Sequence, residues 1–183
     1  TSTLRTRISY AVFCLKKKRK VALFCNIQPE QVIQSIDAAS IYEVPLLMKK
    51  ERLDEVVIDR LKLNNFQEPD LAGWEGFLNR LQKPKSSVRI GLIGKYVELK
   101  DAYKSIAEAF VHAGAQLECK VNISWIHSES LHEDNIEDKL HSLNGVLIAP
   151  GFGARGIEGK VDAVKYAREN NIPYFGICLG MQC

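Results

Sequence analysis

The feature that most constrains the fold is the alternation of short apolar runs with amphipathic stretches after residue 87. Apolar runs of this length, separated by stretches with helical period, are typical of buried parallel strands joined by helices. The pattern predicts a doubly wound, mostly parallel α/β sheet with helices on both faces and a functional site at the carboxyl ends of its strands. The expected strands are residues 88–93, 121–126, 145–149 and 172–175, and the expected helices are residues 102–113, 136–143 and 161–167.

The first 83 residues show a different pattern of apolar residues. A continuous apolar run predicts one buried strand, and a proline with acidic neighbours predicts the start of a helix. Two further stretches place apolar side chains at helical spacing, which is more typical of a core face than of a binding site. The expected elements are a strand at 21–25, a helix opened by Pro29, an interruption at 44–47, and helices at 53–61 and 71–81.

A short polar segment separates the two regions that show these different patterns. Residues 84–87 contain only proline, lysine and serine, a composition that predicts a linker. We therefore expect one domain at residues 1–83 and a second at residues 88–183.

Composition and charge exclude several classes of protein. The 183 residues are 46% hydrophobic and 26% charged, the apolar runs are too short to span a membrane, and no secretion signal is visible in residues 1–14. Five cysteines without regular spacing predict neither a disulfide framework nor a zinc site, so we expect a reduced, cytoplasmic environment. The net charge of +3 is local, because residues 1–20 hold 7 of the 25 basic residues and no acid, which leaves 18 basic against 22 acidic residues elsewhere. The run 16–20 has the composition of a nuclear import signal or nucleic-acid patch, but an acidic remainder would repel phosphate, so we expect no nucleic-acid partner.

One cysteine stands between two glycines after the last expected strand. Gly176 and Gly180 flank Cys178 at a spacing that permits a sharp strand-to-helix turn, the nucleophile elbow, which exposes the central side chain. A thiol at the start of a helix also favours the thiolate. The alternative is a small, inert core cysteine beside tight turns.

A glycine-rich loop at residues 150–159 follows the preceding expected strand. Acyl transfer needs backbone N–H groups aimed at the oxyanion of the tetrahedral intermediate. Gly151 can supply one such donor, because glycine lets the backbone approach a ligand, and the amide of Leu179 can supply the other. The alternative for this loop is an ordinary flexible turn.

These motifs resemble a known family. Residues 175–182 read Phe-Gly-Ile-Cys-Leu-Gly-Met-Gln and residues 150–159 read Pro-Gly-Phe-Gly-Ala-Arg-Gly-Ile-Glu-Gly, which resembles the class I glutamine amidotransferases and, within them, the CTP synthase family. Residues 91–105 are similar to the opening of that family's glutaminase domain. Residues 20–46 are similar to the end of its synthetase (amidoligase) domain, a P-loop-type α/β domain. The resemblance covers about residues 16–183, and residues 1–15 fall outside it.

For the second domain, the resemblance implies glutamine hydrolysis with Cys178 as nucleophile and Gly151 and Leu179 as the oxyanion hole. It also implies a loop that couples the allosteric activator GTP to the glutaminase. The implied pocket for glutamine is lined by Leu179, Gly180, Met181 and Gln182, and the implied GTP lid holds Arg155, Gly156 and Glu158.

For the first domain, the resemblance implies that ATP phosphorylates the O4 of UTP and that ammonia then replaces this oxygen to give CTP. Lys20 matches a lysine that binds the phosphates of UTP or of the feedback inhibitor CTP, and Ile36, Asp37 and Ala38 match the segment that holds the adenine of ATP. ATP acts as its Mg²⁺ complex, and the family is typically a homotetramer.

The family pattern is incomplete in these 183 residues. The resemblance places the magnesium carboxylates before Thr1 and the glutaminase histidine and glutamate after Cys183, so we expect a fragment without metal ligands and without measurable activity on its own. None of the four histidines matches a family position. Two other functions stay open: a non-catalytic α/β binding module with a redox-sensitive Cys178, and the amidotransferase part of another biosynthetic enzyme.

Overall fold

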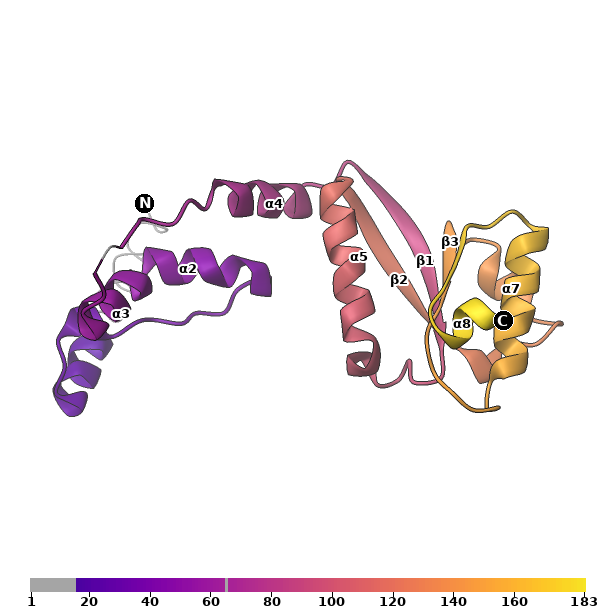
Figure 1. Cartoon of the computed structure of the whole chain (residues 1–183), viewed down its shortest axis with the longest axis horizontal. Helices are drawn as coiled ribbons and strands as arrows, with labels where there is room; N and C mark the ends of the chain where they lie inside the picture. Colours follow the sequence, from indigo (N-terminus) through magenta and orange to yellow (C-terminus); the bar gives the residue numbers. More distant parts are fainter. Residues whose placement is uncertain (1–15, 65) are drawn as a thin grey trace, which may run out of the picture. The chain divides into compact units, whose positions relative to one another are not determined.

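The computed structural model describes residues 16–64 and 66–183 (Figure 1). The chain divides into two compact units, Thr1–Gly73 and Trp74–Cys183. No helix of the described residues is long and apolar enough to cross a membrane.

The described part of the first unit is built from helices and single 3₁₀ turns. Residues 16–25 are helical, so the strand expected at 21–25 is wrong. Within this segment Ala22 is 2% exposed, whereas Leu23 and Phe24 are 80% and 78% exposed. A single buried side chain among these three suits a helix that packs along a narrow stripe, whereas a strand buried on both faces would cover all three. The other elements are η1 (Pro29–Gln31), η2 (Ile41–Glu43), α2 (Val44–Lys50) and α3 (Leu53–Leu61).

The remaining differences in this unit occur at two prolines. The helix expected after Pro29 is a single 3₁₀ turn. The interruption expected at 44–47 is instead the start of α2, with Pro45 in the first turn, where a missing N–H costs nothing. The predicted helix at 53–61 is confirmed as α3.

The second unit contains a four-stranded sheet in the order β2-β1-β3-β4, with every pair parallel. The strands fall where the apolar runs predicted them, and helices connect them as expected for a doubly wound sheet. The elements in chain order are α4 (Ala72–Gln82), β1 (Ser86–Gly94), η3 (Lys100–Tyr103), α5 (Lys104–Gln116), β2 (Cys119–His127), η4 (Ser128–Ser130), α6 (Ile136–Leu140), β3 (Gly145–Ile148), α7 (Ile157–Glu169), β4 (Tyr174–Gly176) and α8 (Leu179–Gln182).

Successive side chains of the central strands point to opposite faces and join separate cores. Ile93 and Ile148 pack with residues of α6 and α7, while Leu92 and Leu147 pack with Tyr103 and with residues of α5. All four strand residues are at most 6% exposed. The sheet is therefore covered by α5 on one face and by α6 and α7 on the other (Figure 1), which confirms the predicted α/β class.

The boundary between the compact units differs in position from the expected linker. Ser86 and Ser87, expected in the linker, are the first two residues of β1 and pair with β2. Most of α4 belongs to the second unit, where the Phe77 ring lies 5.8 Å from that of His112 on α5. The domain limits 1–83 and 88–183 stay predictions.

Candidate active site

Cys178 occupies the turn between β4 and α8 in an unusual backbone conformation. Its φ is 54° and its ψ is −114°, and its side chain is exposed. A non-glycine residue with positive φ outside the left-handed helical region is strained, and such strain persists where the surrounding structure enforces it. The turn is fixed by the amide of Met181, which donates to Cys178 O at 3.0 Å, and by that of Ile177, which donates to Ile148 O at 3.1 Å.

The two glycines around Cys178 are required by close contacts. A Cβ on Gly176 would lie 2.3 Å from Gly180 O, and a Cβ on Gly180 would lie 2.3 Å from Ile148 O. Both contacts are with backbone, which cannot move as a side chain can. The glycine spacing thus lets α8 lie against the end of β3 and exposes the thiol, as the nucleophile elbow predicts.

The carboxyl ends of β3 and β4 bring the glycine-rich loop to the same edge of the sheet as Cys178. Ile148 pairs with Gly176 in the parallel register, and the loop starts two residues after Ile148. Gly151 has a φ of 148° and Gly153 a φ of 86°, conformations that L side chains rarely adopt. The order of the strands also reverses between β1 and β3, the kind of position where open α/β sheets bind ligands.

Two lysines that the sequence reasoning did not single out lie under this loop. Lys95, directly after β1, is 4% exposed, and Lys160, in α7, is 0% exposed. The Lys95 Nζ donates to Phe152 O and, at 2.7 Å, to Gly153 O. The Lys160 Nζ donates to Ala149 O at 3.0 Å. Burial, and next the charge of Lys95, lower the pKa of Lys160, against the opposing influence of Cys183 and then of Cys178.

Tyr174 supports the elbow from within β4. Its hydroxyl donates to Gly180 O, so it ties the strand before Cys178 to the helix after it. Burial raises the pKa of this phenol above its usual value. The hydroxyl therefore keeps its proton and its role as a donor at neutral pH.

The residues expected to form the glutamine pocket lie in α8. Gly180 is buried against β3, while Met181 is 71% exposed and Gln182 is exposed as well. The structure therefore places these residues beside the nucleophile, and their role in binding glutamine stays a prediction.

Two of the expected lid residues, Arg155 and Gly156, lie beside η4, and Arg155 also lies beside the segment that follows β1. Arg155 Nε lies 3.0 Å from Glu129 Oε1, and the Arg155 guanidinium lies 5.7 Å from the centre of the Tyr96 ring. Gly156 precedes α7 with a φ of 70°, and a Cβ there would lie 2.3 Å from the Ser128 hydroxyl. Glu158 is exposed in the first turn of α7.

Three of the four histidines make contacts away from the elbow. His127 ends β2, which β1 and β3 separate from β4, and its Nδ1 accepts from the amide of Glu129. His141 follows α6 and its Nδ1 lies 2.9 Å from Glu137 O. His112 lies on α5 beside Phe77. Among the residues described, no group of three or more His, Cys, Asp or Glu side chains could hold a metal ion.

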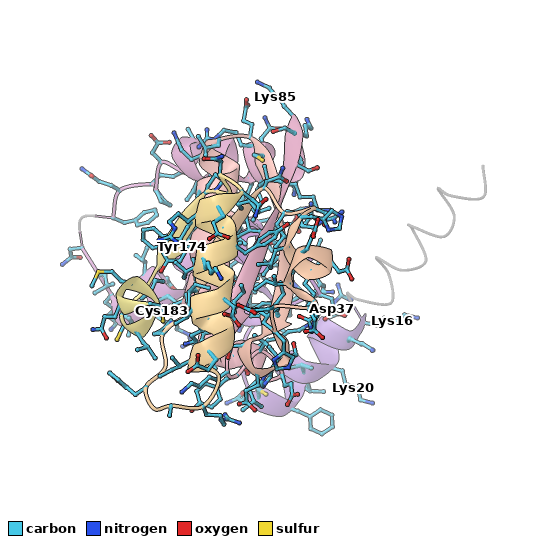
Figure 2. All side chains as sticks on the ribbon, turned by 90° about the vertical axis from the view of Figure 1, so that its right-hand side faces the viewer. Lys16, Lys20, Asp37, Lys85, Tyr174 and Cys183 are labelled. Atoms are coloured by element: carbon cyan, nitrogen blue, oxygen red, sulfur yellow. The ribbon has the colours of Figure 1, made fainter. Side chains whose placement is uncertain are left out.

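The site residues expected in the first unit lie on two neighbouring segments. Lys20 is exposed on the helical segment 16–25 (Figure 2), where a strand was expected from residue 21, and its role in binding phosphates stays a prediction. Ile36–Ala38 lie in an irregular segment between η1 and η2. Glu51 joins the two segments, because it pairs with Lys18 and accepts from the amide of Gln34 at 3.1 Å. The bond from Lys18 is the main reason why the pKa of Glu51 is lowered.

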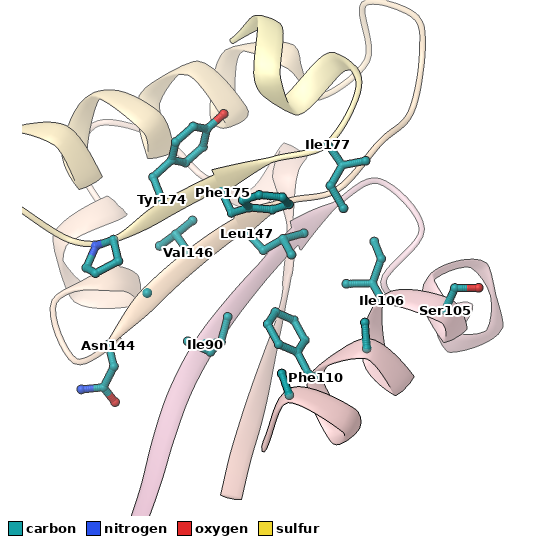
Figure 3. Close-up of a pocket in the computed structure, with 14 residues that line it drawn as sticks. Ile90, Ser105, Ile106, Phe110, Asn144, Val146, Leu147, Tyr174, Phe175 and Ile177 are labelled. Atoms are coloured by element: carbon teal, nitrogen blue, oxygen red, sulfur yellow. The ribbon is translucent and has the colours of Figure 1, made fainter. Parts of the chain in front are cut away.

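A separate cavity of about 510 Å³ lies between α5 and the sheet (Figure 3). Ile106 and Phe110 of α5 face Leu147, Phe175 and Ile177 across it. An almost wholly apolar lining offers little to recognise an amide or a carboxylate, so this cavity is not the candidate site for glutamine.

Two family models match the chain. "CTP synthase N-terminus" matches residues 5–63, and "Glutamine amidotransferase class-I" matches residues 98–183. The chain belongs to the CTP synthase family. The first match begins at residue 5, so the expectation that residues 1–15 fall outside the resemblance is wrong for residues 5–15. These residues lie outside those that the structure describes. A match to both models in this order also separates the chain from other amidotransferases.

Individual relatives agree with the family models. The CTP synthase of Cytophaga hutchinsonii is 63% identical over 166 residues, which are 91% of this chain, and that of Flavobacterium johnsoniae is 62% identical over 165 residues, which are 90% of it. This chain spans 31% of the length of each of these two relatives. A solved structure, the glutaminase domain of Trypanosoma brucei CTPS with bound acivicin, is 40% identical with a TM-score of 0.49, over 52% of this chain and 38% of that one.

Proposed function

We propose that this chain supplies the glutaminase nucleophile and part of the synthetase domain of a CTP synthase, which makes CTP from UTP with ATP and with ammonia from glutamine. The observation that carries the proposal is the exposed Cys178 at φ 54° and ψ −114°, held between two glycines that have no room for a side chain. A core cysteine needs neither exposure nor strain.

The chemistry of the first step follows from the elbow. The Cys178 thiolate attacks the carboxamide carbon of glutamine, and the amides of Gly151 and Leu179 stabilise the oxyanion that forms. The C–N bond then breaks, the nitrogen leaves as ammonia after it gains a proton, and a γ-glutamyl thioester remains. Water hydrolyses this thioester to glutamate and restores the thiol.

In the second step the ammonia is used by the synthetase domain. ATP phosphorylates the O4 of UTP, and ammonia displaces that phosphate to give CTP. Lys20 contributes a cation for the phosphates of UTP or CTP, and Ile36, Asp37 and Ala38 contribute to the site for the adenine of ATP. ATP requires Mg²⁺, and because the described residues hold no group of metal ligands, no part of this step is assigned to the ion.

Regulation and assembly complete the proposal. Arg155, Gly156 and Glu158 form a lid that responds to GTP, CTP acts as a feedback inhibitor at the site of Lys20, and the enzyme is a cytoplasmic homotetramer. The contacts of Arg155 with Glu129 and Tyr96 support a lid that is held in place by weak, exposed interactions.

The test uses a hybrid enzyme in which this chain replaces the matching segment of the Cytophaga hutchinsonii CTP synthase. Cys178→Ala should abolish glutamine-dependent CTP formation and leave ammonia-dependent formation intact, because free ammonia bypasses the thioester. Cys119→Ala, at the start of β2, is the matched control and should change neither activity. Equal loss of both activities in Cys178→Ala would contradict the proposal.

A further inference from the structure

The two lysines under the glycine-rich loop are buried and donate to backbone carbonyls rather than to carboxylates. Lysine is rarely fully buried unless it is paired. Within residues 16–64 and 66–183, no ion pair joins Lys95 or Lys160 to a carboxylate. The charge of Lys95 also disfavours the charged form of Lys160. Two neighbouring buried cations therefore reduce stability, and apolar side chains of equal length would not.

All the acceptors of these lysines belong to one short segment. Lys160 binds Ala149 O, and Lys95 binds Phe152 O and Gly153 O. The loop lies directly on the two side chains, since a Cβ on Gly151 would lie 3.8 Å from Lys95 Cδ and 4.0 Å from Lys160 Nζ. The lysines thus hold both ends of the segment that contains Gly151.

A side chain that binds a backbone carbonyl also fixes the direction of the N–H group of the next residue. In a planar trans peptide the C=O of one residue and the N–H of the next point in opposite directions. When Lys95 binds the carbonyls of Phe152 and Gly153, the N–H groups of Gly153 and Ala154 are turned away from the lysine. A loop rich in glycine has little stiffness of its own, so these bonds and that of Lys160 to Ala149 O restrict the chain on both sides of Gly151.

We propose that Lys95 and Lys160 are positioning residues of the glutaminase site, which hold the residues on either side of Gly151 so that the Gly151 amide meets the oxyanion formed at Cys178. This inference rests on the proposed function. It explains why two lysines without a carboxylate in an ion pair are kept in the interior of this unit. Donors that are fixed before the reaction need no reorganisation during it, so the cost in stability is offset by a gain in catalysis.

The test compares Lys95→Met and Lys160→Met in the hybrid enzyme. Methionine has a similar length and no charge, so we expect folding to be retained, with an unchanged or higher Tm. Losing one oxyanion donor costs about 10² to 10³ in kcat, and we expect a misplaced loop to lower the glutamine-dependent kcat by about tenfold or more. The KM for glutamine should change less than about threefold, because the lost contact belongs to the transition state.

Three controls separate positioning from a general structural effect. Lys165→Met removes an exposed lysine from the same helix and should leave both activities unchanged. Ammonia-dependent CTP formation should persist in both variants. Alkylation of Cys178 by iodoacetamide, followed by mass spectrometry of the peptide, should continue at a rate within about threefold of that in the unsubstituted hybrid, because alkylation forms no oxyanion.

The outcomes distinguish the two proposals. A glutamine-dependent kcat within about threefold of the unsubstituted hybrid in both variants would overturn the positioning role. A parallel fall of Tm, alkylation and both activities would also overturn it and assign the lysines to folding alone. Glutamine-dependent activity that survives Cys178→Ala would instead contradict the proposed function.

Discussion

The substitution Gly180→Ala tests whether the elbow depends on close backbone contact. The added Cβ would lie 2.3 Å from Ile148 O and 2.9 Å from Ile148 Cβ, both in the buried strand β3. An ordinary carbon–oxygen contact is about 3.3 Å or longer, so α8 and Cys178 must move by about 1 Å. Overpacking of this kind costs about 1 to 3 kcal/mol, and a 1 Å shift of a reacting group can cost about 10² in rate.

The measurements are the Tm of the chain by circular dichroism and the activity of the hybrid enzyme. A loss of 1 to 3 kcal/mol should lower the Tm by roughly 5 to 20 °C in a domain of about 100 residues. Glutamine-dependent CTP formation should fall by about 10² while ammonia-dependent formation persists. Gly76→Ala is the matched control in the same unit: its Cβ would meet only the Arg80 side chain at 3.6 Å, and helix propensity predicts a gain of about 0.5 to 1 kcal/mol. An unchanged Tm and full glutaminase activity in Gly180→Ala would refute the reasoning.

Three further predictions concern charged side chains. Burial and Lys95 lower the pKa of Lys160 in the folded chain, so between that lowered value and 10.5 the unfolded chain binds more protons than the folded chain. The free energy of unfolding therefore rises with pH in this range. Urea unfolding should show a smaller rise with pH in Lys160→Met than in the unsubstituted chain. In the hybrid enzyme, Lys20→Ala should raise the UTP requirement about ten- to a hundredfold, whereas Lys16→Ala on the same exposed segment should not, and equal effects would remove Lys20 from the site. Glu129→Gln removes an exposed partner of Arg155 and should leave the Tm unchanged. It should lower the GTP concentration needed for half-activation by up to about fivefold. An unchanged GTP response would show that this contact does not restrain the lid.

The sheet and the elbow could be predicted because both depend on local patterns. Continuous apolar runs predicted all four strands of the second unit to within a few residues. The elbow followed from the spacing of Gly176, Cys178 and Gly180, because this motif is local in sequence, although the contact that requires glycine at 180 is with Ile148 of β3.

The errors arose where tertiary packing decides the outcome. A five-residue apolar run such as 21–25 fits a buried strand or a helix, and length alone could not separate them. The burial of Lys160 was missed for a similar reason, because a lysine is normally assigned to the surface. Its spacing of three and seven residues from the buried Ala163 and Ala167 was the available signal.

Trapping the acyl-enzyme tests the central claim most directly. The hybrid enzyme is mixed with glutamine, quenched in acid, digested and analysed by mass spectrometry for a γ-glutamyl thioester. We predict the adduct on the peptide that contains Cys178, and its absence in Cys178→Ala. A hybrid that forms CTP from glutamine with no adduct on this peptide, or with an adduct on Cys183 instead, would contradict the assignment of the nucleophile.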